Sequence, residues 1–127
     1  MTHPNAELLR RLFGAFGSDA KQISAALARD IVWRVPGNTV MSGEYRGRME
    51  VVDFLRRTGL ETGGTYRSLL HTVFANDDWG VAIYRAQGTR NGIDLDVEQA
   101  LVIRFREGEL AEVTAVPLDA AFDAFWA

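Results

Sequence analysis

The chain has 127 residues, enough for one domain with a single buried core, and we expect residues 1–127 to form that domain. With a net charge of −3 it offers no basic surface, so we expect no nucleic-acid partner and no membrane partner. The absence of cysteine excludes disulfides, thiolate nucleophiles and cysteine-based metal sites. Because the first residues lack a signal-peptide pattern and no apolar run is long enough for a membrane span, we expect a cytoplasmic location.

The first part of the chain is predicted to hold two helices. Asn5 is a suitable cap for the first, in which Leu12 belongs to the apolar face, and His3 is expected in a frayed end. Ser18 or Asp19 then starts a second helix.

A strand, a turn, a short strand and a helix follow. The segment IVWRV, residues 31–35, alternates as a strand does and ends at the turn dipeptide Pro36-Gly37. Residues 42–45 are predicted to form the short strand, and Gly47 leads into the helix.

The second half of the chain is predicted to be strands, and one turn sets their register. Asn91-Gly92 is a strong signal for a two-residue type I′ hairpin, and closing the hairpin there places Arg85 opposite Glu98. A slip of one residue would exchange the two faces of the sheet. The apolar face then carries Ala82, Tyr84, Ala86, Leu95, Val97, Gln99, Leu101 and Ile103.

The next turn, at residues 107–109, allows two registers. A two-residue loop sets Arg104 against Ala111, whereas a three-residue loop with Gly108 in a left-handed conformation sets Arg104 against Glu112. The apolar pattern favours the second register. The last strand then adds Ala111, Val113 and Ala115 to the apolar face.

The opposite face of this sheet is expected to be only partly polar. Apolar strips on the far side of a sheet usually mark an interface, so we expect a homodimer through this surface. The strip consists of Val81, Ile83, Ala100, Val102 and Val116.

Five motifs in this order resemble the SnoaL-like and ketosteroid-isomerase-like members of the NTF2-like superfamily. They are DIVWRVPG at 30–37, SGEYRG at 42–47, HTVFANDD at 71–78, RFREGEL at 104–110 and DAAFDAFW at 119–126. The resemblance implies an α+β fold, the NTF2-like cone: a strongly bent antiparallel or mixed sheet with about three helices over its concave face and a short C-terminal helix. It also implies a dimer and an apolar cavity, which relatives use as polyketide cyclases, isomerases or epoxide hydrolases, or for binding without catalysis.

The catalytic groups of a ketosteroid isomerase are missing from the matching positions. The family places a carboxylate base just before the proline of the turn, where this chain has Val35. The tyrosine of the first helix would fall near Arg11 or Leu12, and the acid of the sheet falls on Leu101. Steroid-isomerase chemistry is therefore disfavoured, whereas a SnoaL-type cyclase, which depends on one acid–base residue, is not excluded.

Two residues are candidates for proton transfer inside the cone. His71 lies between Leu69 and Val73 in a predicted strand, so we expect it to point inward, and its pKa range suits proton transfer. The alternative is a core histidine bonded to a neighbour, and a shift of one residue would turn it outward. The alternation along the last strand, continued to Asp119, predicts that this side chain points inward. Asp119 either caps the final helix or acts as a general base.

The predicted cavity has a polar pair within its apolar wall. Tyr84 and Gln99 sit side by side, either as a structural pair or as the polar end of a ligand pocket. The residues expected to bind a ligand are Trp33, Met41, Tyr45, Phe54, Tyr84, Val97, Gln99, Leu101 and Val113.

The sequence thus predicts a SnoaL-like protein that binds a small, largely apolar molecule. As an enzyme it would be a cofactor-free isomerase, cyclase or hydrolase, with His71 or Asp119 as base and Tyr84 or Gln99 orienting a carbonyl. The alternative is a non-catalytic binding or assembly module whose cavity is filled by its own side chains, and an adaptor that binds proteins through its surface is a third possibility. We expect no metal and no cofactor, because the aspartates match no calcium loop.

Overall fold

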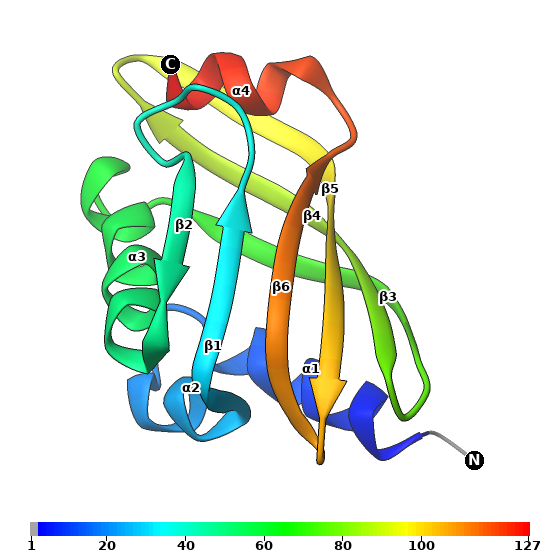
Figure 1. Cartoon of the computed structure of the whole chain (residues 1–127). Coiled ribbons are helices and arrows are strands. Elements are labelled where there is room, and N and C mark those ends of the chain that lie inside the picture. Colours follow the sequence, from blue (N-terminus) through cyan, green and yellow to red (C-terminus); the bar gives the residue numbers. More distant parts are fainter. Residues whose placement is uncertain (1–2) are drawn as a thin grey trace.

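The protein folds as a curled, unclosed mixed sheet covered by helices (Figure 1). The computed structural model describes residues 3–127. The six strands of the described part lie in the order β2-β1-β6-β5-β4-β3, and β1 and β6 run parallel while the other neighbours are antiparallel. The elements are α1 (Pro4–Ala15), α2 (Ala20–Ala26), β1 (Leu27–Val35), β2 (Gly43–Arg46), α3 (Gly47–Glu61), β3 (Arg67–Ala75), β4 (Trp79–Arg90), β5 (Ile93–Arg106), β6 (Glu109–Pro117) and α4 (Ala120–Trp126).

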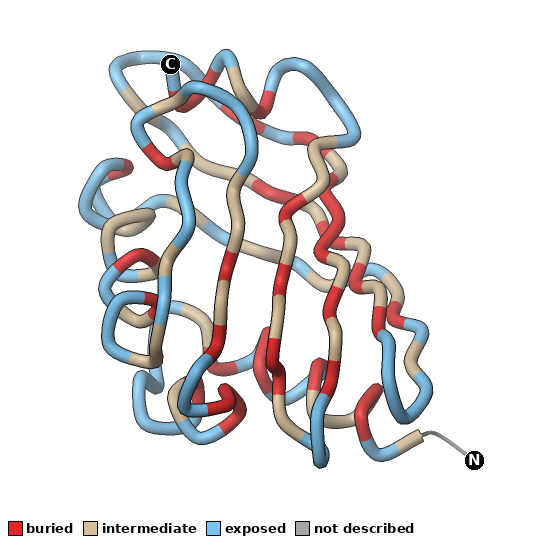
Figure 2. The backbone as a smooth tube through the Cα atoms, in the orientation of Figure 1, coloured by how far each residue is buried: buried red, intermediate tan, exposed pale blue. Residues whose placement is uncertain are grey.

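The predicted α+β cone is confirmed, with α1, α2 and α3 toward one end of the sheet and α4 at the other (Figure 1). Buried residues alternate with more exposed ones along the long strands (Figure 2). This alternation puts one face of each strand in the core and the other outside.

No helix within residues 3–127 combines the length and the apolar character needed to cross a bilayer.

The first helix begins two residues earlier than a cap at Asn5 implies, so the assignment of Asn5 as its cap is wrong. Pro4 occupies the first helical position, where its fixed φ is favourable, and His3 is the cap, its Nδ1 accepting the Asn5 N–H at 3.0 Å. His3 is not frayed, because its Nε2 lies 2.8 Å from Asp77 Oδ1. The Asn5 side chain instead donates to the Asn76 carbonyl oxygen at 3.0 Å and fastens α1 to the β3–β4 loop.

The predicted aspartate caps are confirmed at two helices. Asp19 Oδ1 accepts the Gln22 N–H at 3.0 Å at the start of α2. Asp119 Oδ1 accepts the Ala121 N–H at 2.9 Å at the start of α4. Each side chain satisfies a backbone N–H that the helix itself leaves without a partner.

The β4–β5 hairpin has the predicted register. Asn91 and Gly92 adopt φ values of 52° and 77°, as a two-residue type I′ turn requires. Every predicted pair is present, Tyr84 with Gln99 among them. The inner and outer faces of this hairpin are therefore those read from the sequence.

The β5–β6 hairpin reaches the predicted register by a different turn. Arg104 pairs with Glu112 as expected, but the turn is a two-residue one, in which Glu107 and Gly108 have φ values of 51° and 77°. The register shifts next to this turn because Ala111 is an extra residue on β6, a β-bulge. The predicted three-residue loop is therefore wrong, although its consequence for the rest of the strand is right.

We predict that Gly80→Ala destabilises the fold by about 1–3 kcal/mol, because a Cβ on Gly80 would lie 2.8 Å from Phe105 Cε2 and 3.1 Å from Leu9 Cδ1. The matched change Gly14→Ala in α1 meets no atom within 4 Å and should stabilise the protein by about 0.5–1 kcal/mol. Urea unfolding of both variants measures the difference. Equal stability of the two would contradict the close packing at Gly80.

Candidate functional site

A cavity of about 640 Å³ lies between the concave face of the sheet and the helices. Its wall draws on the end of α1, on α2, α3 and α4, and on five strands, so that distant parts of the sequence meet there. Leu101 and Ala115, paired residues of β5 and β6, form part of the wall on the sheet side. Ligand sites measure roughly 300–1,000 Å³, whereas a close-packed core leaves few voids larger than a water molecule.

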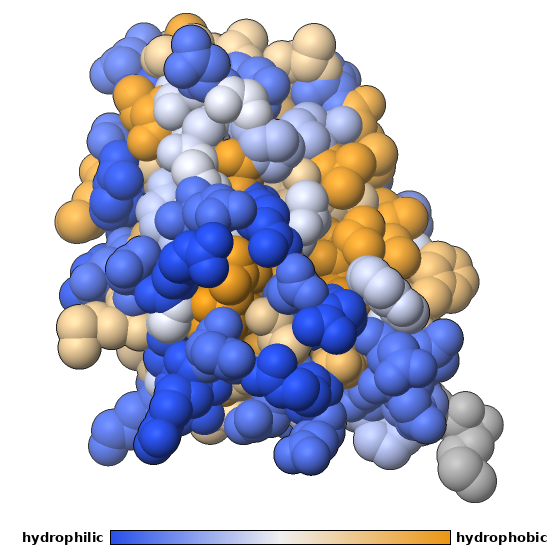
Figure 3. Space-filling view, viewed as in Figure 1, coloured by the Kyte–Doolittle hydropathy of each residue, from blue (hydrophilic) through white to orange (hydrophobic). Residues whose placement is uncertain are grey.

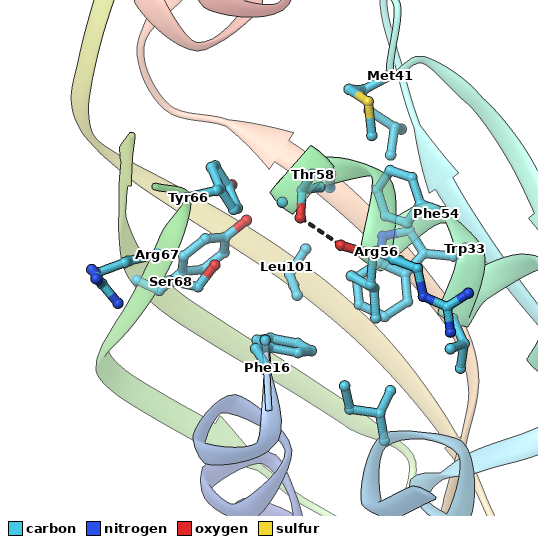
Figure 4. Close-up of a pocket in the computed structure, with 18 of the residues that line it drawn as sticks. Phe16, Trp33, Met41, Phe54, Arg56, Thr58, Tyr66, Arg67, Ser68 and Leu101 are labelled. Atoms are coloured by element: carbon cyan, nitrogen blue, oxygen red, sulfur yellow. Dashed lines mark hydrogen bonds between the residues drawn. The ribbon is translucent and has the colours of Figure 1, made fainter. Parts of the chain in front are cut away.

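One side of the cavity is aromatic. The ring centroids of Trp33 on β1 and Phe54 on α3 are 5.9 Å apart, and Tyr45 stacks on Phe54 at 4.3 Å. The Tyr45 hydroxyl donates to the Met41 carbonyl oxygen at 2.7 Å, which ties the turn before β2 to the tyrosine that stacks on Phe54. Trp33 and Phe54 lie together on one side of the cavity, with Met41 beyond them (Figure 4). Such a wall suits flat, apolar ligands.

The opposite side of the cavity carries hydroxyl groups. Tyr66 and Ser68 face this space across from Trp33 and Phe54 (Figure 4), and Tyr84 joins them from the neighbouring strand β4. Burial raises the pKa of Tyr66 to about 12, an effect that Ser68 and Tyr84 partly oppose. Both phenols stay protonated at neutral pH, because burial and the nearby Tyr66 raise the pKa of Tyr84 well above its usual value too.

Gln99 is a buried amide without a hydrogen-bond partner. It lies directly opposite Tyr84 on the inner face of the sheet, and 0% of the residue is exposed. Neither its Nε2 nor its Oε1 atom has a partner at hydrogen-bond distance within residues 3–127, although the amide lies close enough to Tyr84 to oppose in part the rise that burial causes in the pKa of that phenol. An amide buried without a partner costs about 1–3 kcal/mol, so this position is unfavourable for the stability of the protein.

The cavity contains some of the predicted ligand-binding residues but not all of them. Tyr45 is separated from the space by Phe54, on which it stacks. Val97, Gln99 and Val113 face inward and are buried in the packed core beside the cavity. The predicted residues that line the cavity are Trp33, Met41, Phe54, Tyr84 and Leu101.

The predicted inward direction of His71 is wrong. β3 contains a bulge between Leu70 and Thr72, so the alternation that the prediction relied on is broken at His71. The His71 side chain is 68% exposed and its Nδ1 lies 3.5 Å from Glu98 Oε1, on the outer face of the sheet. His71 is therefore outside the cavity.

Asp119 also lies away from the cavity, since it is exposed and its carboxylate caps α4. Among the described residues that line the cavity, the one acidic residue is Asp19, which caps α2. A general base must reach the proton that it removes, and neither His71 nor Asp119 meets that condition for a molecule in the cavity.

Sequence reasoning missed several residues of the cavity wall. Tyr66, just before β3, and Ser68, at its start, both point inward, and this spacing of two residues was available as a signal. Phe122 and Trp126 share one face of α4 at a spacing of four residues, which was a second signal. Phe16 continues the four-residue spacing of Leu8 and Leu12, but it lies just past the end of α1, where the helix no longer fixes its direction.

Comparison with known proteins identifies relatives over nearly the whole chain. The model of a family described as the SnoaL-like domain matches residues 9–113. An uncharacterised protein of Mycobacterium tuberculosis is 33% identical over 124 residues, which cover 95% of each chain.

Solved structures share the fold. Bal32a, from a soil-derived mobile gene cassette, superimposes with a TM-score of 0.92 at 33% identity, covering 98% of this chain and 97% of that one. A protein from Catenulispora acidiphila with a ketosteroid isomerase-like fold, solved in complex with trimethylamine, gives a TM-score of 0.78 at 15% identity and covers 94% of this chain and 92% of that one. At that identity the second likeness shows the fold alone.

We predict that Gln99→Leu stabilises the protein by about 1–3 kcal/mol, because leucine fills a similar volume without an unsatisfied amide. The matched control is Gln87→Leu, since the Gln87 side chain on the outer face donates to Asp96 Oδ1 at 3.1 Å and should give no such gain. Urea unfolding of both variants measures the effect. Destabilisation by Gln99→Leu would mean that the amide is satisfied after all.

Proposed function

The chain belongs to the SnoaL-like domain family of the NTF2-like superfamily, and we propose that its cavity binds a small, largely apolar molecule. The observation that carries the proposal is the volume of about 640 Å³ between an aromatic side and a hydroxyl-bearing side. Ligand pockets are mostly apolar, with a few polar groups that orient the ligand, and this cavity has that composition.

The geometry supports binding better than the two alternatives predicted from the sequence. A module whose interior is filled by its own side chains would leave little space, and the cavity volume argues against it. Acid–base catalysis by His71 or Asp119 lacks support because neither side chain lines the cavity. Binding requires neither residue.

We predict that N-phenyl-1-naphthylamine, an uncharged probe that fluoresces in apolar surroundings, binds in the cavity. Ala115→Phe should weaken its binding by about tenfold or more, because the added ring enters the space that the probe needs. A fluorescence titration of wild type and variant measures the two dissociation constants.

The control for this experiment is Thr114→Phe, the same enlargement one residue earlier on β6, on the opposite face of the strand. It should leave the dissociation constant of the probe unchanged. Equal binding by Ala115→Phe and wild type, or no binding by either, would overturn the proposed function.

We also infer that two copies of the chain associate through the outer face of the sheet. Figure 3 shows charged side chains over the middle of this face and apolar ones gathered over β5, β4 and β3. Phe74 and Trp79 are 62% and 53% exposed and extend the strip predicted from the sequence. The resulting outer apolar patch consists of Phe74, Trp79, Val81, Ile83, Ala100, Val102 and Val116.

The charges beside this outer apolar patch favour a second copy of the chain as the occupant. Arg85 pairs with Asp96 at 2.6 Å, and Arg104 pairs with Glu112 at 2.5 Å. Because both signs flank the patch, two copies related by a twofold axis can present opposite charges to each other. A partner of one dominant charge would meet no such complement.

We predict that the wild type has about twice the chain mass of 14.1 kDa in solution and that Val102→Arg converts it to the monomer. The matched control is Met49→Arg on α3, where the methionine is 80% exposed and away from the sheet, and it should leave the dimer intact. Light scattering after size-exclusion chromatography measures the masses. A monomeric wild type would contradict the association.

A further inference from the structure

We infer that the hydroxyl-bearing end of the cavity binds an uncharged acceptor oxygen, such as a ketone, ester or amide carbonyl, and rejects a carboxylate of the same shape. The inference rests on the proposed function, because it concerns a ligand of that cavity. It assigns the recognition to Tyr66 and Tyr84, with Ser68 beside Tyr66.

The hydrogen-bonding groups at this end are hydroxyls. Tyr66 and Tyr84 are close enough for their phenols to interact, and Ser68 lies next to Tyr66. Of two neutral phenols that face each other, only one can donate its proton to the other. The second proton can be donated to Ser68, to the Gln99 amide or to a ligand. A ligand with an acceptor oxygen therefore gains a hydrogen bond at this end that an alkyl group cannot make.

Gln99 is a second buried polar group beside these phenols. The amide is fully buried opposite Tyr84 and lies close enough to oppose in part the rise that burial causes in the pKa of that phenol, but neither of its polar atoms has a partner at hydrogen-bond distance within residues 3–127. Tyr84 itself lines the cavity. When a ligand oxygen accepts the proton of one phenol, that phenol no longer donates to the other. The lone pairs of the second phenol are then free to accept from the Gln99 amide. A ligand in the cavity thus changes which hydrogen bonds are available to Gln99.

No cation is directed at the hydroxyl-bearing end from the described part of the chain. Arg67 belongs to the rim, but its guanidinium points away from the cavity, on the opposite side of β3 from Tyr66 and Ser68 (Figure 4). Arg56 lies across the cavity on α3, and its Nη1 is 3.4 Å from Asp53 Oδ1. A carboxylate buried against the phenols would thus lose its hydration without gaining an opposite charge.

The two pKa shifts agree with this geometry. A phenol whose pKa rises on burial sits where a negative charge is disfavoured, and both Tyr66 and Tyr84 behave in this way. A carboxylate placed at the same end meets the same environment. The selectivity for an uncharged oxygen therefore follows from the low polarity around the phenols and the direction of the arginines.

The test uses three naphthalenes of similar shape that compete with bound N-phenyl-1-naphthylamine at pH 7.4. They are 2-acetylnaphthalene with a neutral carbonyl, 2-isopropylnaphthalene without oxygen, and 2-naphthoate with a carboxylate. We expect the ketone to bind about tenfold more tightly than the hydrocarbon, since one additional hydrogen bond is gained. The carboxylate should bind at least about tenfold more weakly than the ketone.

Tyr84→Phe and Tyr66→Phe identify the residues responsible. Each should remove most of the preference for the ketone over the hydrocarbon while the hydrocarbon itself binds as before, which also shows that the variant is folded. The matched control is Tyr45→Phe, because its hydroxyl donates to the Met41 carbonyl oxygen behind Phe54 and does not face the cavity. This control should keep the preference.

Each outcome decides between the two proposals. If the probe binds but the ketone and the hydrocarbon are equal, the recognition by phenols is overturned and the proposed function stands. If the carboxylate binds most tightly, an arginine of the rim takes the ligand and the inference is also overturned. If neither the probe nor any naphthalene binds, the proposed function fails and the inference falls with it.

Discussion

The hairpin of β4 and β5 is the element on which the rest of the structure depends. Its two-residue turn at Asn91 and Gly92 needs positive φ at both positions, and asparagine followed by glycine meets that requirement at little cost. The turn fixes which residues of two long strands face inward. Tyr84 and Leu101 reach the cavity wall for this reason, and a slip of one residue would replace Tyr84 with Ile83 or Arg85 and Leu101 with Ala100 or Val102.

The alternation of inward and outward residues along the strands predicted most of the fold. It failed where a strand contains an extra residue. The β4–β5 hairpin has no bulge, and its pairs follow from the turn alone. On β6 the apolar pattern led to the right register although the bulge at Ala111 was not foreseen. On β3 the bulge at His71 reverses the face of the residues that follow, and the same reasoning gave the wrong direction. A bulge has no reliable sequence signal because it depends on how the strand bends against its neighbours.

The cavity was less predictable than the sheet because helices and loops contribute much of its wall. The resemblance to a family predicted that a cavity exists, and strand parity placed Tyr84 and Leu101 in its wall. The direction of Phe16 depends on how α1 ends against α2, and the separation of Tyr45 from the space depends on the packing of Phe54. These are tertiary outcomes, which local periodicity does not determine. The curled sheet remains hollow because the four helices within residues 3–127, of 7 to 15 residues each, cover it only in part.

The deviations from good packing gather in one place, and that is an argument for function. A core selected for stability alone would fill a space of about 640 Å³ and would not bury an amide without a partner. Here the space adjoins Tyr66 just before β3, Tyr84 on β4 and Gln99 on β5. Proteins retain such local violations mainly where a site requires them. The cost in stability is then offset when a ligand fills the space, because binding to the folded form alone stabilises it.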